Sequence, residues 1–163
     1  MTDCLNVGEE IVSRVSELGL RFRVSGQRWY GEPERRIKEQ FLVQARLLEL
    51  DEMTDPRSCE PLTERLWRRY GANAFEMLES VREDPTNADR LIEHAEYLRC
   101  EIEQAGRREM ITKLDDFLRR RSKISLVVRR DDIIDAPGLR EACQILFGAD
   151  GDAKLQEYVE NSA

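Results

Sequence analysis

The sequence predicts an all-α protein, a compact bundle of short helices with irregular connections. Apolar residues recur every three or four positions in one segment after another, which is the spacing of one helix face. No run alternates apolar and polar residues for long enough to build a sheet, and S-L-V-V-R-R at 125–130 comes nearest. Charged residues make up 36% of the chain, above the usual proportion of about a quarter, which favours helices with charged outer faces.

The first two helices are separated by a predicted linker. Asn6 can cap the first helix, with Glu9 in the capping-box position and Gly19 beyond its end. This helix carries one apolar stripe, formed by Val7, Ile11, Val12, Val15 and Leu18. Residues 20–33 contain glycine and proline residues that interrupt a helix, so they form the linker. Pro33 suits the first turn of the second helix, whose stripe is Ile37, Phe41, Ala45 and Leu48.

Three further helices are expected in the middle of the chain. Pro61 begins the first of them and Gly71 closes it. Its buried residues are Leu62 and Leu66. Asn73 caps the next helix, whose inward residues are Phe75, Leu78 and Val81. The longest helix runs from Asn87 to about Gly106, because one helical face then carries Leu91, Ala95, Leu98 and Ile102.

The last third of the chain carries three more expected helices. Thr112 caps a helix that runs through Arg121, with Asp115 in the capping-box position. Its inward residues are Leu114, Phe117 and Leu118. The final two helices extend from about Pro137 to Phe147 and from about Asp152 to Val159, on either side of residues 148–151. Residues 1–163 are accordingly expected to form a single helical domain.

Composition and missing motifs argue against several classes of function. The formal charge of −7 disfavours a nucleic-acid binder, because phosphate binding relies on a positive field. There is no G-x-G-x-x-G turn, no P-loop and no G-x-S-x-G elbow, so no catalytic or cofactor-binding residue is predicted. No stretch reaches the roughly 20 apolar residues of a transmembrane helix, and the start lacks a signal peptide. A cytoplasmic location is therefore expected.

Neither the cysteines nor the single histidine indicates a metal site. The four cysteines, Cys4, Cys59, Cys100 and Cys143, form no C-x-x-C pair, and His94 has no partner at metal-binding spacing. A catalytic Cys–His pair would need a spatial partnership that the spacing does not indicate. We therefore expect no metal site, and reduced, buried thiols at all four positions.

The stretch E-M-I-T-K-L-D-D-F-L-R-R-R-S-K-I at 109–124 sets an acidic pair before three consecutive arginines. Asp115 and Asp116 in the first helical turn, and Arg119–Arg121 in the last, complement the helix dipole. Successive residues lie about 100° apart, so at least one arginine is expected to lie along the protein beside a carboxylate. The candidate carboxylates are Glu101, Glu109 and Asp115. The disfavoured alternative is a nucleic-acid site that adds Lys123, Arg129 and Arg130.

Residues 97–124 carry the pattern E-[IV]-x-x-A-x-x-x-E-x-x-x-x-L-x-D-x-L-x-R-R-[TS]. Its matching residues are Glu101, Ile102, Ala105, Glu109, Leu114, Asp116, Leu118, Arg120, Arg121 and Ser122. With this pattern the segment resembles the C-terminal domain of the family of FAD-dependent glycerol-3-phosphate dehydrogenases and alpha-glycerophosphate oxidases. Two shorter stretches are also similar and in the right order, T-D-C-L-N-V-G-E-E-I at 2–11 and R-L-W-R-R-Y-G-A-N-A at 65–74. Residues 20–60 and 131–163 match loosely.

The resemblance implies a parent enzyme that oxidises sn-glycerol 3-phosphate to dihydroxyacetone phosphate. Such an enzyme passes electrons through FAD to a membrane quinone, or to oxygen in the oxidase branch. The flavin and substrate residues of the family lie in a large N-terminal part that this sequence lacks. We therefore expect a C-terminal accessory domain that holds no FAD and is inactive alone. Its expected partner is the flavin domain, and self-association is a further option. The domain is expected to reach the membrane only through the parent enzyme, on the inner face of that membrane.

Within this resemblance, six charged residues are expected to hold the domain together or to dock it to the flavin domain. They are Glu101, Glu109, Asp115, Asp116, Arg120 and Arg121. The alternative reading is a stand-alone helical module for protein interaction or regulation that keeps the fold without the enzyme.

Overall fold

The computed structural model describes residues 4–19 and 33–160, with side chains from Glu10 onward in the first range. The chain divides into two compact units, Met1–Glu32 and Pro33–Ala163, and each is described by itself. The prediction of a single domain over residues 1–163 stays a prediction. All described secondary structure is helical apart from an isolated antiparallel bridge between Arg90 and Leu98, which confirms the all-α fold class.

The first unit contains helix α1 (Cys4–Glu17). The helix begins two residues before Asn6, so Asn6 lies in its first turn and the predicted cap is wrong. Gly19 follows the helix with φ +81, as the predicted end requires. In the predicted apolar stripe, Ile11 and Leu18 are exposed, and the side chain of Val7 lies outside the described part. The predicted linker also lies outside the described residues, except for Pro33.

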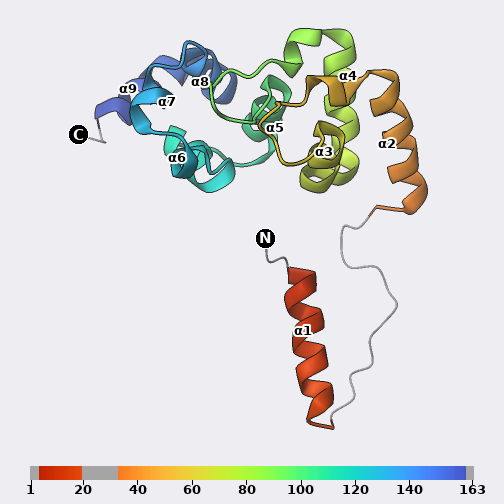
Figure 1. Cartoon of the computed structure of the whole chain (residues 1–163). Helices are drawn as coiled ribbons and strands as arrows, with labels where there is room; N and C mark the ends of the chain where they lie inside the picture. The colour runs from red at the N-terminus through yellow and green to blue at the C-terminus, as the bar shows by residue number, and fades with distance from the viewer. Residues whose placement is uncertain (1–3, 20–32, 161–163) are drawn as a thin grey trace. The chain divides into compact units, whose positions relative to one another are not determined.

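The second unit is built from helices of 4 to 13 residues. In order they are α2 (Arg35–Leu47), α3 (Leu62–Tyr70), α4 (Ala74–Glu83), α5 (Arg99–Arg108), α6 (Ile124–Val127), α7 (Arg130–Ile134), α8 (Leu139–Phe147) and α9 (Gly151–Glu160). Short 3-10 turns lie at Leu50–Met53, Gly71–Asn73, Pro85–Ala88 and Gly148–Asp150. Figure 1 shows α2, α3 and α4 at one end of this unit, α6 to α9 at the other, and α5 between them.

Two clusters of buried side chains fill the second unit. The N-terminal cluster consists of Phe41, Ala45, Leu50, Leu62, Leu66, Ala74, Met77, Leu78, Val81, Leu98 and Cys100. The C-terminal cluster consists of Leu91, Ile92, Ala95, Ile102, Ala105, Leu114, Phe117, Leu118, Ile124, Val128, Ile133, Ala136, Leu139, Ala142, Cys143 and Leu146. Helix α5 supplies Cys100 to the first and Ile102 to the second, so it contributes to both clusters.

The predicted apolar faces of α2, α3 and α4 are largely confirmed. Their buried members are Phe41, Ala45, Leu62, Leu66, Leu78 and Val81, while Ile37, Leu48 and Phe75 are partly buried. The predicted starts are less accurate. Pro33 precedes the N-cap Glu34, and Pro61 is itself the N-cap of α3. Asn73 stands at the N-cap of α4 but makes no capping hydrogen bond through its side chain. Gly71 ends α3 with φ +52, as predicted.

The long helix predicted from Asn87 to Gly106 is wrong in its first half. Residues 89–98 form a closed loop, in which the Arg99 amide donates to the Asp89 carbonyl at 2.8 Å and His94 adopts φ +65. All four residues of the predicted face are buried nonetheless. The loop sends Leu91 and Ala95 to the C-terminal cluster but Leu98 to the N-terminal cluster. A single helical face could not serve both clusters, so burial was predicted correctly and the backbone was not.

The segment after α5 also differs from the predicted regular helix. Leu114, Phe117 and Leu118 are buried as expected. From Asp116 to Arg121, however, the backbone is a π-helix, and the Ser122 amide donates to the Phe117 carbonyl five residues earlier at 2.8 Å. The last two predicted helices are present as α8 and α9, with starts at Leu139 and Gly151.

A close backbone approach fixes the loop 89–98 against the start of α8. A β-carbon added at Gly138 would lie 2.2 Å from the Leu91 carbonyl oxygen and 2.7 Å from the Leu91 Cα. Only a residue without a side chain fits there, because neither backbone atom can turn aside.

We predict that Gly138→Ala lowers the free energy of unfolding by about 1–3 kcal/mol, because the added methyl forces a backbone shift. Urea denaturation followed by circular dichroism measures this. Gly106→Ala serves as the matched comparison, since its added carbon would lie 3.2 Å from the Ile145 carbonyl oxygen and should cost clearly less. A Gly138→Ala protein as stable as the wild type would show that the loop does not lie against α8 as described.

Candidate functional site

The centre of the second unit holds a completely buried carboxylate, Glu101, with 0% of the residue exposed. One of its oxygens, Oε2, accepts from the Leu98 amide at 2.9 Å and from Arg65 Nη2 at 2.5 Å. The other, Oε1, accepts from the Tyr70 hydroxyl at 3.1 Å and from Arg69 Nη1 at 3.2 Å. Three donors from α3 and one from the loop before α5 therefore converge on one side chain, which satisfies the need of a buried charge for partners.

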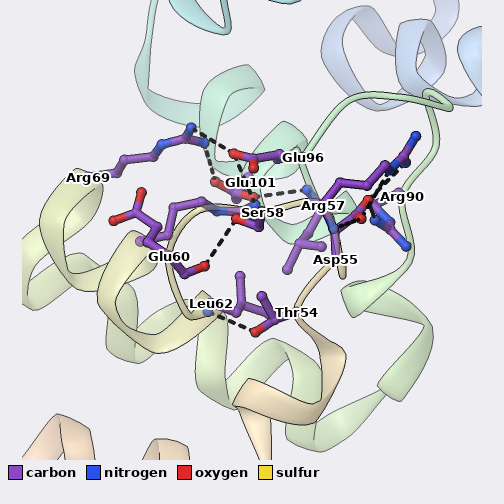
Figure 2. Close-up of polar contacts among 12 residues, drawn as sticks. Thr54, Asp55, Arg57, Ser58, Glu60, Leu62, Arg69, Arg90, Glu96 and Glu101 are labelled. Carbon is purple, nitrogen blue, oxygen red and sulfur yellow. Dashed lines mark hydrogen bonds and ion pairs between the residues drawn. The ribbon is translucent and has the colours of Figure 1, made fainter. Parts of the chain in front are cut away.

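Local sequence explains this convergence. Arg65 and Arg69 are four residues apart on α3, so they lie on one face of that helix. Glu101 stands in the first turn of α5, where a carboxylate can accept the free amide of Leu98 and complement the helix dipole. Glu96 adds a second carboxylate, 3.8 Å from both guanidinium groups, and Figure 2 shows it beside Arg69 and Glu101.

Burial governs the chemistry of the groups around Glu101. Removal from water raises the pKa of the Tyr70 hydroxyl, and the neighbouring Glu101 charge raises that pKa further. Burial also raises the pKa of Tyr97, although Arg69 acts in the opposite direction. Both phenols are thus held in the protonated form, and Tyr70 can act as a hydrogen-bond donor to Glu101. This arrangement stabilises an ionic core and provides no activated nucleophile.

A line of contacts leads from Glu101 to the surface. The Arg69 guanidinium lies over the Tyr97 ring, 4.6 Å from its centroid. The Tyr97 hydroxyl donates to the Arg121 carbonyl at 3.3 Å. Arg121 Nη2 in turn donates to the Glu109 carbonyl at 3.1 Å, and its Nε lies 4.0 Å from the Glu109 carboxylate. The structure therefore connects three of the six predicted charged residues, Glu101, Glu109 and Arg121.

Asp116, rather than the predicted Asp115, ties down the start of the π-helix. Asp116 Oδ2 accepts from the Thr112 hydroxyl at 2.9 Å and from the Lys113 amide at 3.0 Å. Its Oδ1 lies 2.9 Å from Arg120 Nη1. These bonds, led by the one from Thr112, lower the pKa of the Asp116 carboxyl. Asp115 is exposed and lies outside this group, so the predicted capping box is wrong by one residue.

Of the three arginines, Arg121 lies along the protein beside the Glu109 carboxylate, as expected. Arg119, Arg120 and Arg121 are nevertheless all exposed. The turn of a π-helix is wider than that of an α-helix. Phe117 and Leu118 occupy its inward side, and the three arginines that follow them cover the outward side. Glu109, one of the predicted candidate carboxylates, pairs with Arg121. Glu101, another candidate, pairs with Arg65 and Arg69 instead.

Arg120 and Arg121, but not Arg119, line an open hollow of about 630 Å³. Its lining is Arg69, Tyr70, Tyr97, Arg108, Glu109, Met110, Arg120, Arg121, Ser122 and Lys123. Five of these residues are cationic and only Glu109 is anionic, in a chain whose formal charge is −7. Of the predicted nucleic-acid set, Arg130 points elsewhere, since its Nη2 donates to the Val159 carbonyl at 2.9 Å.

A second ionic cluster, which was not predicted from the sequence, connects the loop 89–98 to residues 55–57. Asp55 accepts from the Arg57 amide at 2.8 Å and from Arg57 Nη2 at 2.9 Å, and Arg90 also pairs with it. Figure 2 shows Arg57 and Arg90 on either side of Asp55. The Arg57 hydrogen bonds, with help from Arg90, hold the pKa of Asp55 well below its usual range. Arg57 Nη1 also lies 3.0 Å from His94 Nδ1.

The cysteines and the acidic residues show no metal site in the described part of the chain. No group of three or more His, Cys, Asp or Glu residues there could hold a metal ion. Burial raises the pKa of Cys100 and of Cys143 to about 12, so both are inert thiols. Cys59 is exposed, which corrects the expectation of burial, and the side chain of Cys4 is not among those described.

The fold is thus a helical domain organised round a buried ionic cluster that joins residues 65–70 to residues 97–101. The family model of the C-terminal domain of alpha-glycerophosphate oxidase matches residues 22–138. The match spans more than half of the chain, and the chain belongs to this family. The similar stretches at 65–74 and 97–124 fall inside the matched region, whereas the one at 2–11 falls outside it. No curated protein and no solved structure matches the chain.

None of the described helices is long and apolar enough to cross a bilayer. The roles of the six charged residues in holding or docking the domain stay predictions. These residues are Glu101, Glu109, Asp115, Asp116, Arg120 and Arg121.

We predict that Glu101→Gln lowers the free energy of unfolding by about 3 kcal/mol, because Arg65 is then buried without its counter-charge. Chemical denaturation at neutral pH measures the loss. The matched control is Glu39→Gln, which breaks the exposed Arg35–Glu39 pair of 2.9 Å and should change stability by less than about 0.5 kcal/mol. Equal effects of the two substitutions would contradict a structural role for Glu101.

The lowered pKa of Asp116 predicts a defined pH dependence. A carboxyl with a depressed pKa in the folded state stabilises the protein above its ordinary value of about 4, and this stabilisation is lost as pH falls through the lowered value. At pH 7 the Asp116→Asn protein should therefore be less stable than wild type by about 1 kcal/mol. Unfolding curves from pH 7 down to pH 2 should show the difference shrinking. A gap that stays constant across this range would rule out the charge of Asp116 as its cause.

Proposed function

We propose that this chain is the helical accessory domain of an FAD-dependent glycerol-3-phosphate dehydrogenase. In this proposal the parent enzyme oxidises sn-glycerol 3-phosphate to dihydroxyacetone phosphate and passes the electrons through FAD to a quinone. The chain packs on the flavin domain, binds no FAD itself and has no activity alone. The observation that carries the proposal is the family match over residues 22–138.

The character of the ionic groups supports a structural role. Both oxygens of the buried Glu101 carboxylate already accept hydrogen bonds, from Arg65, Arg69, Tyr70 and the Leu98 amide. The partly buried acids Asp55 and Asp116 are likewise held by internal donors. Groups that serve as general acids or bases are instead placed within reach of a substrate proton. The arrangement favours a rigid body that presents a surface to a partner.

The surface that best suits the flavin domain lies on α6 and the π-helix before it. Leu126 and Val127 on α6 are 63% and 81% exposed, which is unusual for two adjacent large apolar residues. Arg120 and Arg121 stand on the preceding π-helix and supply exposed positive charge. Apolar residues with arginine at their edge are typical of protein interfaces. We assign the docking role predicted for Arg120 and Arg121 to this surface.

The parent enzyme also accounts for location. In the full-length enzyme this domain is proposed to lie on the cytoplasmic side, where the flavin domain reaches the inner face of the membrane. Membrane contact is thereby a property of the parent enzyme and not of the helices described here.

The first test of the proposal is spectroscopic. The purified chain should be colourless, should retain no FAD after gel filtration, and should not reduce a dye with glycerol 3-phosphate. A yellow preparation that reduces the dye would overturn the proposal.

The second test is association with the flavin domain of a family enzyme from the same organism, produced as a separate chain. Leu126→Ser with Val127→Ser should weaken this association by about tenfold or more, because two apolar contacts are lost. The matched control replaces Val43 and Leu47, which are 57% and 77% exposed on α2, by serine and should have little effect. If wild-type chain and flavin domain do not associate, the stand-alone module becomes the better account.

A further inference from the structure

We propose that the hollow beside the π-helix binds a phosphate monoester. The hollow is lined by Arg69, Arg108, Arg120, Arg121 and Lys123, which come from three separate stretches of the chain. The proposal goes beyond the docking role, because it concerns a small ligand bound by this chain alone. It stands or falls independently of the flavin domain.

Two cations of the hollow are positioned by contacts with neighbouring side chains. Arg69 is held by Glu101 and lies over Tyr97. Arg108 Nη2 donates to both carboxylate oxygens of Glu76, at 2.6 and 2.7 Å. Guanidinium groups that are already oriented lose less entropy when they bind an anion than free side chains do.

Two cations keep donors available for a ligand. Arg120 is paired with Asp116 through Nη1, and within the described residues its Nε and Nη2 have no protein partner. The side chain of Arg120 is 75% exposed. Lys123, at φ +62, has no ion-pair partner in the described part of the chain. A phosphate oxygen in the hollow can therefore accept from both without first breaking an internal ion pair.

The charge of the hollow selects the class of anion. A phosphate monoester carries close to two negative charges at neutral pH and presents three acceptor oxygens, whereas a carboxylate carries one charge. Planar guanidinium groups bind phosphate through paired N–H donors. An acidic chain otherwise repels anions, so binding should be confined to the place where cations outnumber carboxylates.

The remainder of the lining suits an organic group on the phosphate. Tyr70 and Tyr97 contribute aromatic surface to the same hollow, and both residues are partly buried. A small apolar or aromatic substituent can pack on these rings while its phosphate meets the cations. The unusual backbone here is a second indication, because π-helical turns are rare and frequently occur at functional sites.

The test is a titration of the full chain, labelled with ¹⁵N, with inorganic phosphate and separately with phenyl phosphate at constant ionic strength and pH 7.5. Amide signals of residues 97, 109–110 and 120–123 should shift in a saturable way. Phenyl phosphate should bind more tightly than inorganic phosphate, and acetate should produce little change. Shifts spread over all exposed arginines, or equal affinity for the two phosphates, would overturn the proposal.

The variant that removes the site is Arg120→Gln with Arg121→Gln, which should weaken phenyl phosphate binding at least about tenfold through loss of charge-assisted hydrogen bonds. Both residues are exposed, so the helical circular dichroism spectrum should be retained. Lys123→Gln provides an independent variant, with an expected loss of about threefold. The control is Arg140→Gln, which removes an exposed arginine that is paired with Asp152 and does not line the hollow. Unchanged binding in both hollow variants, or an equal loss in the control, would contradict the proposal.

Discussion

The structure of the second unit depends on the burial of one carboxylate, Glu101. A charge removed from water is tolerated only where donors surround it, and the chain meets that requirement with two arginines, a tyrosine and a backbone amide. Because these donors come from α3 and from the end of the loop 89–98, satisfying Glu101 links α3 to the first turn of α5. Helix α5 and the loop before it also contribute to both hydrophobic clusters. One ionic constraint thus sets how the two halves of the unit meet.

The influence of this cluster extends to the surface through Arg69 and Tyr97. Tyr97 packs edge-on to Phe117 at 5.7 Å between ring centroids and donates to the Arg121 carbonyl. The same tyrosine therefore contacts the core, the π-helix and an arginine of the buried cluster. The cationic hollow lies where these contacts reach solvent. A structural network and a candidate ligand site are in this way built from one set of side chains.

Sequence reasoning predicted the fold class and most of the buried faces, because helical periodicity records burial directly. It failed where buried residues with helical spacing lie outside a helix. Leu91, Ala95 and Leu98 keep helical spacing but serve two clusters from a loop. The Glu101 carboxylate takes the Leu98 amide that a continued helix would have bonded to residue 94. That competition depends on Arg65 and Arg69, more than 30 residues earlier, which local patterns do not register.

The candidate site was predicted in part. The family pattern identified Glu101, Glu109 and Arg121, which the structure connects, but not the partners of Glu101. A signal for those partners was present, because Arg65 and Arg69 share the apolar face of α3 with Leu62 and Leu66. An arginine on such a face requires a buried anion. Asp116 takes the capping role that was predicted for Asp115, and all three arginines are exposed. Both differences follow from the π-helix, for which the sequence carries no recognised signal.

The most direct measurement of the central claim is a double-mutant cycle between Arg65 and Glu101, using Arg65→Met and Glu101→Gln alone and together. The cycle removes effects that each substitution has on its own and isolates the interaction between the two side chains. If the buried pair organises the unit, its coupling energy should fall between about 1 and 3 kcal/mol. A coupling energy below about 0.5 kcal/mol would contradict the account, because the two residues would then contribute to stability independently.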